Sequence, residues 1–205
     1  ASAGDIDGDG FDDLVIGAYR NDAGGLDAGA AYVIFGSGSL PGSVNLDAVA
    51  LGTGGFKVIG EEAGDLAGGS VSSAGDVNGD GIDDLVVGAQ SNGAGGLYAG
   101  ATYVIFGSQA PITSVNLDAV ALGTGGFKVV GQNADDIAGN SVSSAGDVNG
   151  DGILDIITAN RDSDNASVLL GIGDGTFGAK TDFATGDRPF SVPLGDVNGD
   201  GILDI

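Results

Sequence analysis

The sequence predicts an all-β protein made of repeated units of four antiparallel strands. Self-comparison finds one short motif, built around the residues GDG, four times along the 205-residue chain. Between the copies, segments rich in β-branched and aromatic residues alternate with Gly-rich turns, which is the pattern of short strands and their connections. Helical periodicity is confined to residues 46–51 and their copy 117–122, where we expect a single helical turn.

The four motif copies set the length of the units. Their first residues are Asp5, Asp76, Asp147 and Asp196, so the spacings are 71, 71 and 49 residues. We therefore treat residues 1–205 as one repeat array with phases 5–75, 76–146 and 147–195 and the start of a further repeat at 196–205. Two long units precede a short one.

Four strands are expected in each long unit. In the second unit they are residues 70–77, 82–89, 101–106 and 127–130, and the last of these has its counterpart at 56–59 in the first unit. The third unit lacks the equivalent of residues 37–55, so this stretch is expected to be a removable loop insertion. Four-stranded antiparallel units repeated radially are the blades of a β-propeller, which closes with about 4–8 blades. About three repeat lengths predict an arc of a larger propeller.

Composition narrows the classes of partner. The 42 glycines follow no Gly-X-Y triplet, and 42% hydrophobic residues with a mean hydropathy of +0.23 suffice for a folded core. A formal net charge of −23 disfavours nucleic acid and anionic lipid surfaces and favours cations. The chain has no Cys, no apolar stretch of membrane-spanning length, no signal segment and no initiating Met, so we expect a mature piece or fragment with no membrane insertion.

Each motif copy fits the pattern D-x-[DN]-x-D-G-x-x-D, which predicts a Ca²⁺ site. Alternate positions 1, 3 and 5 direct oxygens to one centre, Gly at position 6 permits the turn that returns position 9, and a position-7 carbonyl completes the shell. Ca²⁺ accepts such irregular sets of oxygens more readily than Mg²⁺ does. The predicted ligands are Asp5, Asp7, Asp9, Phe11 and Asp13; Asp76, Asn78, Asp80, Ile82 and Asp84; Asp147, Asn149, Asp151, Ile153 and Asp155; and Asp196, Asn198, Asp200, Ile202 and Asp204.

Two alternatives apply to these loops. Asp, Asn and Gly also build ordinary turns without a metal, but four copies with one carboxylate spacing favour a cation that neutralises the repulsion. An EF-hand needs Glu at position 12, where this chain has Ile16, Val87 and Thr158. We expect unequal occupancy, with the loops at Asp76 and Asp147 filled most reliably.

The combination of motifs resembles FG-GAP repeats, as found in the integrin α-subunit propeller and in bacterial surface proteins. Residues 33–36 and 104–107 (VIFG) are similar to the FG element, and residues 17–19 and 88–90 are similar to the GAP element without its proline. The third unit, with GDGTF at 173–177, is more similar to VCBS-type repeats. The resemblance covers essentially the whole chain and implies a calcium-binding propeller of a bacterial surface or secreted protein.

The function expected from the resemblance is extracellular or cell-surface adhesion or ligand binding, without catalysis. The chain has no His or Cys, and acid pairs such as Asp83 and Asp84 are assigned to the loop and its following strand. The alternatives are a non-catalytic module appended to a secreted enzyme and a purely structural spacer. As an arc, the fragment is also expected to self-associate.

A protein or glycan ligand is expected on the face opposite the Asp-rich loops. In a four-stranded meander, the connections between the second and third strands and the links between blades share that face, and loops on a rigid scaffold commonly carry binding residues. These segments are residues 20–29, 61–69, 90–100 and 132–139, and they contain Glu61 and the three predicted contact residues Arg20, Asp22 and Tyr98.

Overall fold

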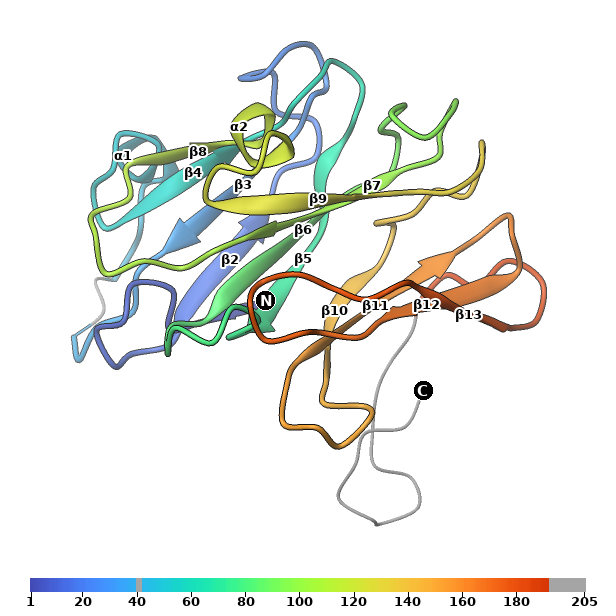
Figure 1. Ribbon diagram of the computed structural model, residues 1–205. Helices are drawn as coiled ribbons and strands as arrows, with labels where there is room; N and C mark the ends of the chain where they lie inside the picture. The colour runs from blue at the N-terminus through green and yellow to red at the C-terminus, as the bar shows by residue number, and fades with distance from the viewer. Residues whose placement is uncertain (40–41, 192–205) are drawn as a thin grey trace.

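The computed structural model describes residues 1–39 and 42–191 and contains three β-sheets side by side (Figure 1). The first sheet has the order β1-β2-β3-β4-β8, with bounds Ser2–Gly4, Asp13–Gly17, Ala30–Ile34, Gly55–Ile59 and Ser114–Asn116. The second is β5-β6-β7-β9, with bounds Ala67–Gly75, Asp84–Ala89, Ala101–Ile105 and Gly126–Val130. The third is β10-β11-β12-β13, with bounds Val142–Gly146, Asp155–Asn160, Asn165–Leu169 and Thr181–Ala184.

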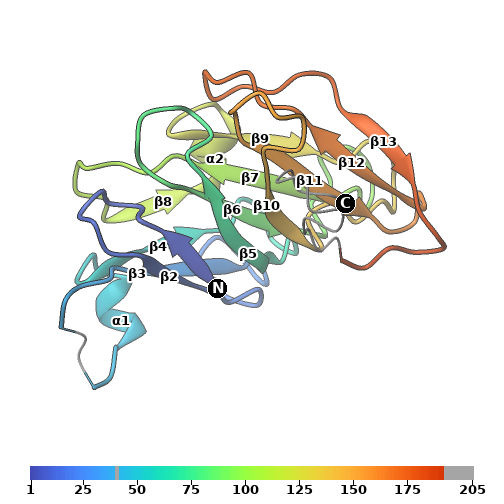
Figure 2. The ribbon, with the colours of Figure 1, turned by 90° about the horizontal axis from the view of Figure 1, so that it is seen from below.

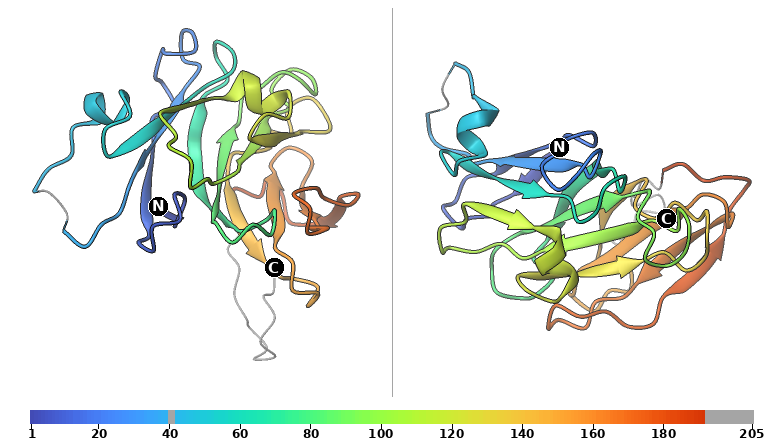
Figure 3. Two further views of the ribbon diagram at one scale, coloured as in Figure 1. Left: turned by 60° about the vertical axis from the view of Figure 1, so that its left-hand side comes forward. Right: turned by 90° about the horizontal axis from the view of Figure 1, so that it is seen from above.

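Within each sheet, the four strands of one repeat unit form an antiparallel meander, which confirms the predicted blades. The first strand of the second blade differs from the expected 70–77, because Asp76 and Val77 leave the sheet to start the Asp-rich loop. That strand instead begins at Ala67 and passes two glycines through a shift in register. Figures 2 and 3 show the three blades fanned around their first strands as an open arc.

The copy of the insertion in the second unit forms secondary structure and contacts another blade, which the prediction of a loop did not include. In the second unit it forms β8, which pairs in parallel with β4 of the first blade, and the helix α2 (Leu117–Ala121). Because β4 is the last strand of its meander, its outer edge has backbone groups that need partners, and β8 supplies them. The insertion thus clamps the second blade to the first. The first unit contains the predicted helical turn as α1 (Leu46–Val49).

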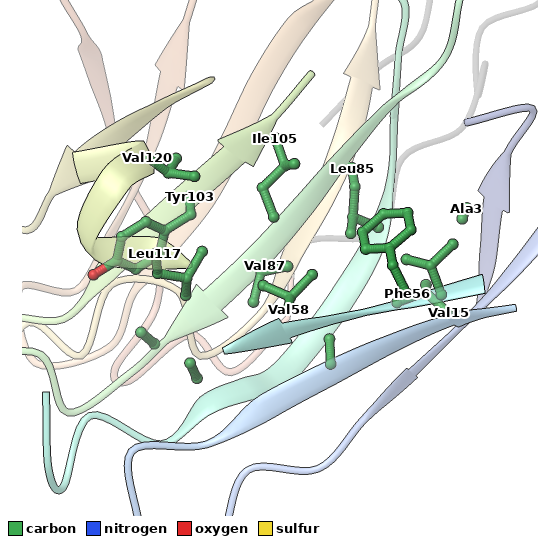
Figure 4. Close-up of a cluster of buried hydrophobic side chains, with 14 of the residues drawn as sticks. Ala3, Val15, Phe56, Val58, Leu85, Val87, Tyr103, Ile105, Leu117 and Val120 are labelled. Carbon is green, nitrogen blue, oxygen red and sulfur yellow. The ribbon is translucent and has the colours of Figure 1, made fainter. Parts of the chain in front are cut away.

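The main core lies between the first two blades. Figure 4 shows Val15, Phe56 and Val58 of the first blade facing Leu85 and Val87 of the second, and all five side chains are buried. Alternation along the strands produces this layer, since every second residue of a strand faces the same neighbour. Leu117 and Val120 of α2 close the same cluster. A second cluster joins the second and third blades, where the rings of Phe127 and Phe177 lie 5.3 Å apart.

Candidate metal site at the Asp-rich loops

The three Asp-rich loops in the described part of the chain occupy equivalent places. Each connects the first and second strands of its blade, namely β1 to β2, β5 to β6 and β10 to β11. Figure 1 shows these loops at the lower ends of the sheets, whereas the connections between second and third strands lie at the upper ends. The fourth predicted loop, with Asp196, Asn198, Asp200, Ile202 and Asp204, lies outside the described residues.

Side-chain oxygens fold each loop around its own backbone. The first Asp accepts hydrogen bonds from the backbone N–H groups of positions 5 and 6, as Asp5 does from Asp9 at 3.0 Å and from Gly10 at 2.9 Å. The position-3 oxygen accepts from the position-5 N–H, and position 5 accepts from position 7. Asp76, Asn78 and Asp80 repeat this pattern, as do Asp147, Asn149 and Asp151.

The position-9 carboxylate is the buried anchor of each loop. Asp13, Asp84 and Asp155 are at most 1% exposed. One oxygen of each accepts from the position-2 N–H, and the other accepts from a Gly N–H after the third strand, as in the 2.7 Å bond from Gly36 to Asp13. This residue therefore ties the loop to the connection that follows the third strand of the same blade.

Burial acts against charge on these anchors. It raises the pKa of the Asp13 carboxyl to about 6 and that of Asp84 to about 7, although the backbone N–H groups oppose the shift and the neighbouring loop carboxylates add to it. Burial also raises the pKa of Asp155. A cation in the loop would favour the charged carboxylates and offset this cost.

In the first loop, the carboxylates of Asp5, Asp7 and Asp13 gather as a set that can hold a metal. One oxygen from each lies within 4.8 Å of the others, and within the described ranges this is the one group of three acids with that property. Burial, followed by the charge of Asp9, raises the pKa of Asp7. The donors are all oxygens, which suits a hard cation such as Ca²⁺. The acidic cluster thus fits the predicted group.

The other predicted ligands stand as follows. The second and third loops have Asn78 and Asn149 at position 3, so each contributes an amide oxygen where the first loop has a carboxylate. Asp9, Asp80 and Asp151 accept the N–H of position 7. The proposed carbonyl ligands of Phe11, Ile82 and Ile153 stay a prediction.

The residues named in the connections on the opposite face differ in how accessible they are to a ligand. Arg20 and Asp22 are exposed and Tyr98 is 50% exposed, so all three are accessible. Glu61 is not available to a ligand, because its carboxylate forms an ion pair with Lys128 at 2.6 Å and accepts a hydrogen bond from the Tyr103 hydroxyl. Burial would raise the pKa of Glu61, but these two partners outweigh it and lower the pKa. Glu61 therefore belongs to the joint between blades.

Asp83 is the site residue that sequence reasoning assigned too narrowly. It precedes the anchor Asp84, yet its carboxylate lies in the first loop, where Asp5 N–H donates to Asp83 Oδ2 at 2.9 Å. The available signal was that the residue before the anchor differs between the repeats, since it is Asp12 in the first unit, Asp83 in the second and Leu154 in the third.

Three blade-like sheets with an acidic loop between their first two strands define a piece of a β-propeller of the FG-GAP type. The chain contains FG-GAP repeats, since the FG-GAP repeat model matches residues 1–34 and 67–105 and the FG-GAP-like repeat model matches residues 147–205. The third unit, for which VCBS-type similarity was expected, thus matches the FG-GAP-like repeat.

Two relatives show distant homology over about half of the chain. A phosphatidylinositol-glycan-specific phospholipase D from Rattus norvegicus is 40% identical over 114 residues, which is 53% of this chain and 13% of that protein. Integrin alpha pat-2 from Caenorhabditis elegans is 35% identical over 116 residues, 55% of this chain and 9% of that protein. The matches therefore span only a small part of each relative. No helix in the described residues is long and apolar enough to cross a membrane.

Proposed function

We propose that this chain is a non-catalytic Ca²⁺-binding propeller module that binds an extracellular protein or glycan. The observation that carries the calcium assignment is the cluster of the Asp5, Asp7 and Asp13 carboxylates, of which Asp13 is the buried anchor. Three carboxylates so close together repel one another unless a cation or protons neutralise them. The fold repeats the same hydrogen-bonded loop in the second and third blades, which supports further sites there.

Calcium binding is tested by isothermal titration of the chain with Ca²⁺ and, separately, with Mg²⁺. We expect Ca²⁺ to bind more tightly, because Mg²⁺ demands a regular octahedral shell that these loops do not supply. Asp5→Asn with Asp7→Asn should remove the first site, and Asp22→Asn, an exposed acid outside the loops, is the matched control. Absence of Ca²⁺ binding in the unmodified chain would exclude the proposal.

The binding role rests on the loops opposite the calcium face. The connections that carry Arg20 and Tyr98 are anchored at their bases, since Leu66 N–H donates to the Asp27 carbonyl at 3.2 Å and Ile137 N–H donates to the Tyr98 carbonyl at 3.0 Å. Beside these hydrogen-bonded positions the connections expose large apolar side chains, with Leu26 at 72% and Leu97 at 68%. Accessible side chains on an anchored backbone are suited to recognition. The homology to an integrin α-chain supports an adhesion partner and a cell-surface or extracellular location.

Ligand binding is tested by adhesion of the chain to an array of extracellular-matrix proteins and glycans. The triple variant Arg20→Ala, Asp22→Ala and Tyr98→Ala should lose adhesion, whereas changes in the insertion on the calcium face, Val44→Ser with Leu51→Ser, should retain it. The reverse result would place the ligand on the calcium face. No adhesion by the unmodified chain would favour a purely structural spacer.

A second candidate is an accessory module of a secreted enzyme. The homology to a phospholipase D supports it, because that match covers only 13% of the relative. In this case the chain itself has no catalytic residues, and its calcium loops stabilise a scaffold. The chain should then show no phospholipase activity alone, and the same ligand-face variant should leave calcium binding unchanged.

A further inference from the structure

The first two Asp-rich loops are joined by direct hydrogen bonds between blades. Asp5, the first acid of its loop, donates its N–H to Asp83 Oδ2 at 2.9 Å, and its carbonyl accepts the N–H of Asp83 at 3.2 Å. Asp83 is thus hydrogen-bonded to both the N–H and the carbonyl of Asp5. The preceding Gly4, with φ of +73°, has no side chain where a Cβ would overlap the Asp83 carboxylate. The close approach needs glycine at this position.

A second connection joins the buried anchors of the same loops. Asp84 accepts the N–H of Gly107 at 2.9 Å, and the next residue, Ser108, donates its N–H to the Ile6 carbonyl at 3.0 Å. Ile6 in turn donates its own N–H to Asp13 at 3.0 Å. The anchor of the second loop is therefore linked to the anchor of the first through a continuous series of backbone groups.

The next joint provides an internal comparison. Leu154 occupies the place of Asp83, and its side chain lies over Gly75 as Asp83 lies over Gly4. An apolar side chain cannot accept a hydrogen bond, and among the described residues no hydrogen bond joins residue 154 to Asp76. The contact between the second and third loops is thus one of packing. Asp12, the counterpart in the first unit, is exposed.

We propose that Asp83 is a positioning residue that couples cation binding at the first and second loops. The inference rests on the proposed calcium function. A cation that orders Asp84 also orders residue 83, its neighbour in the chain, and thereby fixes the backbone of Asp5 before the first loop binds. Coupling is reciprocal, so a cation at the first loop raises the affinity of the second by the same factor. The second and third loops, joined through Leu154, bind independently.

The test is a Ca²⁺ titration of the whole chain followed by the backbone amide signals of Gly10 and Gly81, one in each loop. Disabling the second loop with Asp80→Asn should weaken Ca²⁺ binding at Gly10 about fivefold or more, the range of ordinary coupling. Asp83→Leu, which copies the third unit, and Asp83→Ala should abolish that dependence. Asp83→Asn keeps an oxygen that accepts the Asp5 N–H and should preserve it. Asp12→Leu is the exposed control and should change nothing.

The outcomes separate this inference from the function on which it rests. If Ca²⁺ binds but the affinity at Gly10 is the same with and without Asp80→Asn, the coupling is refuted while the calcium function stands. Undiminished coupling in both Asp83→Leu and Asp83→Ala also refutes the role of Asp83. If no amide signal responds to Ca²⁺ in any variant, both fail together. Amide spectra in EDTA check that each variant is folded.

Discussion

Lys128 of the second blade forms an ion pair with Glu61 of the link that leaves the first blade, with Nζ and Oε2 2.6 Å apart. Both side chains are largely removed from solvent, at 9% and 17% exposure. The repeat counterpart Lys57 instead donates to Asn21 at 2.7 Å, and no carboxylate in the described residues lies within ion-pair distance of it. The lysine at this repeat position therefore forms an ion pair between blades only where the link before its blade contains an acid, as Glu61 does for Lys128.

Removing the charge of Glu61 should loosen that joint. Glu61→Gln copies Gln132, the residue at this place in the second link, and it keeps the shape while leaving Lys128 without its counter-ion. We expect the free energy of unfolding to fall by about 1.5–3 kcal/mol, the range for a hydrogen bond to a charged group. Urea denaturation measures the change. Glu62→Gln, at the exposed neighbour, should stay within about 0.5 kcal/mol, and equal losses in both variants would contradict the assignment.

Calcium should raise the thermal stability of the chain. A ligand that binds only the folded state stabilises it by about 2.7 kcal/mol per site when its free concentration is 100 times the Kd. For a chain of this length that corresponds to a rise in Tm of roughly 5–10 °C per site. Melting followed by circular dichroism in EDTA and in millimolar Ca²⁺ measures the shift. Coincident melts in the two buffers would argue that the loops are metal-free turns.

The pH dependence of the metal-free protein should show the buried anchors. Because Asp13 and Asp84 have pKa values raised from 3.8 to about 6 and about 7, the folded chain binds more protons than the unfolded chain in that range. The free energy of unfolding in EDTA should therefore fall as pH rises from about 4 to about 7. Glu61, with its lowered pKa, has the opposite slope, but only below its ordinary value of 4.5.

Urea titrations in EDTA at a series of pH values measure this slope. Asp84→Asn should flatten it, and excess Ca²⁺ should reduce it, because the cation favours the deprotonated carboxylates. Stability in EDTA that rises steadily from pH 5 to pH 7 would show that the anchors are not the dominant groups.

The blades and the loop positions could be predicted from the sequence because both depend on local signals. Strand alternation, Gly punctuation and the spacing from Asp5 to Asp13 are all readable within one repeat. The strand β8 was missed, because three residues carry no pattern of their own and pair only with the open edge of β4. The joint of Glu61 with Lys128 was missed for the same reason, since two residues 67 positions apart meet only when blades stack.

The face of the first blade that carries Leu14 and Ile16 should promote association between copies of the chain. Leu14 and Ile16 are 52% and 43% exposed, whereas their counterparts Leu85 and Val87 are fully buried against the first blade. An apolar surface that is covered in one repeat and open in the next resembles half of an interface. We expect Leu14→Ser with Ile16→Ser to lower the mass measured by light scattering at high concentration. Leu122→Ser, which is 87% exposed beside α2, is the control. An unmodified chain that stays monomeric at every concentration would show that this face does not drive self-association.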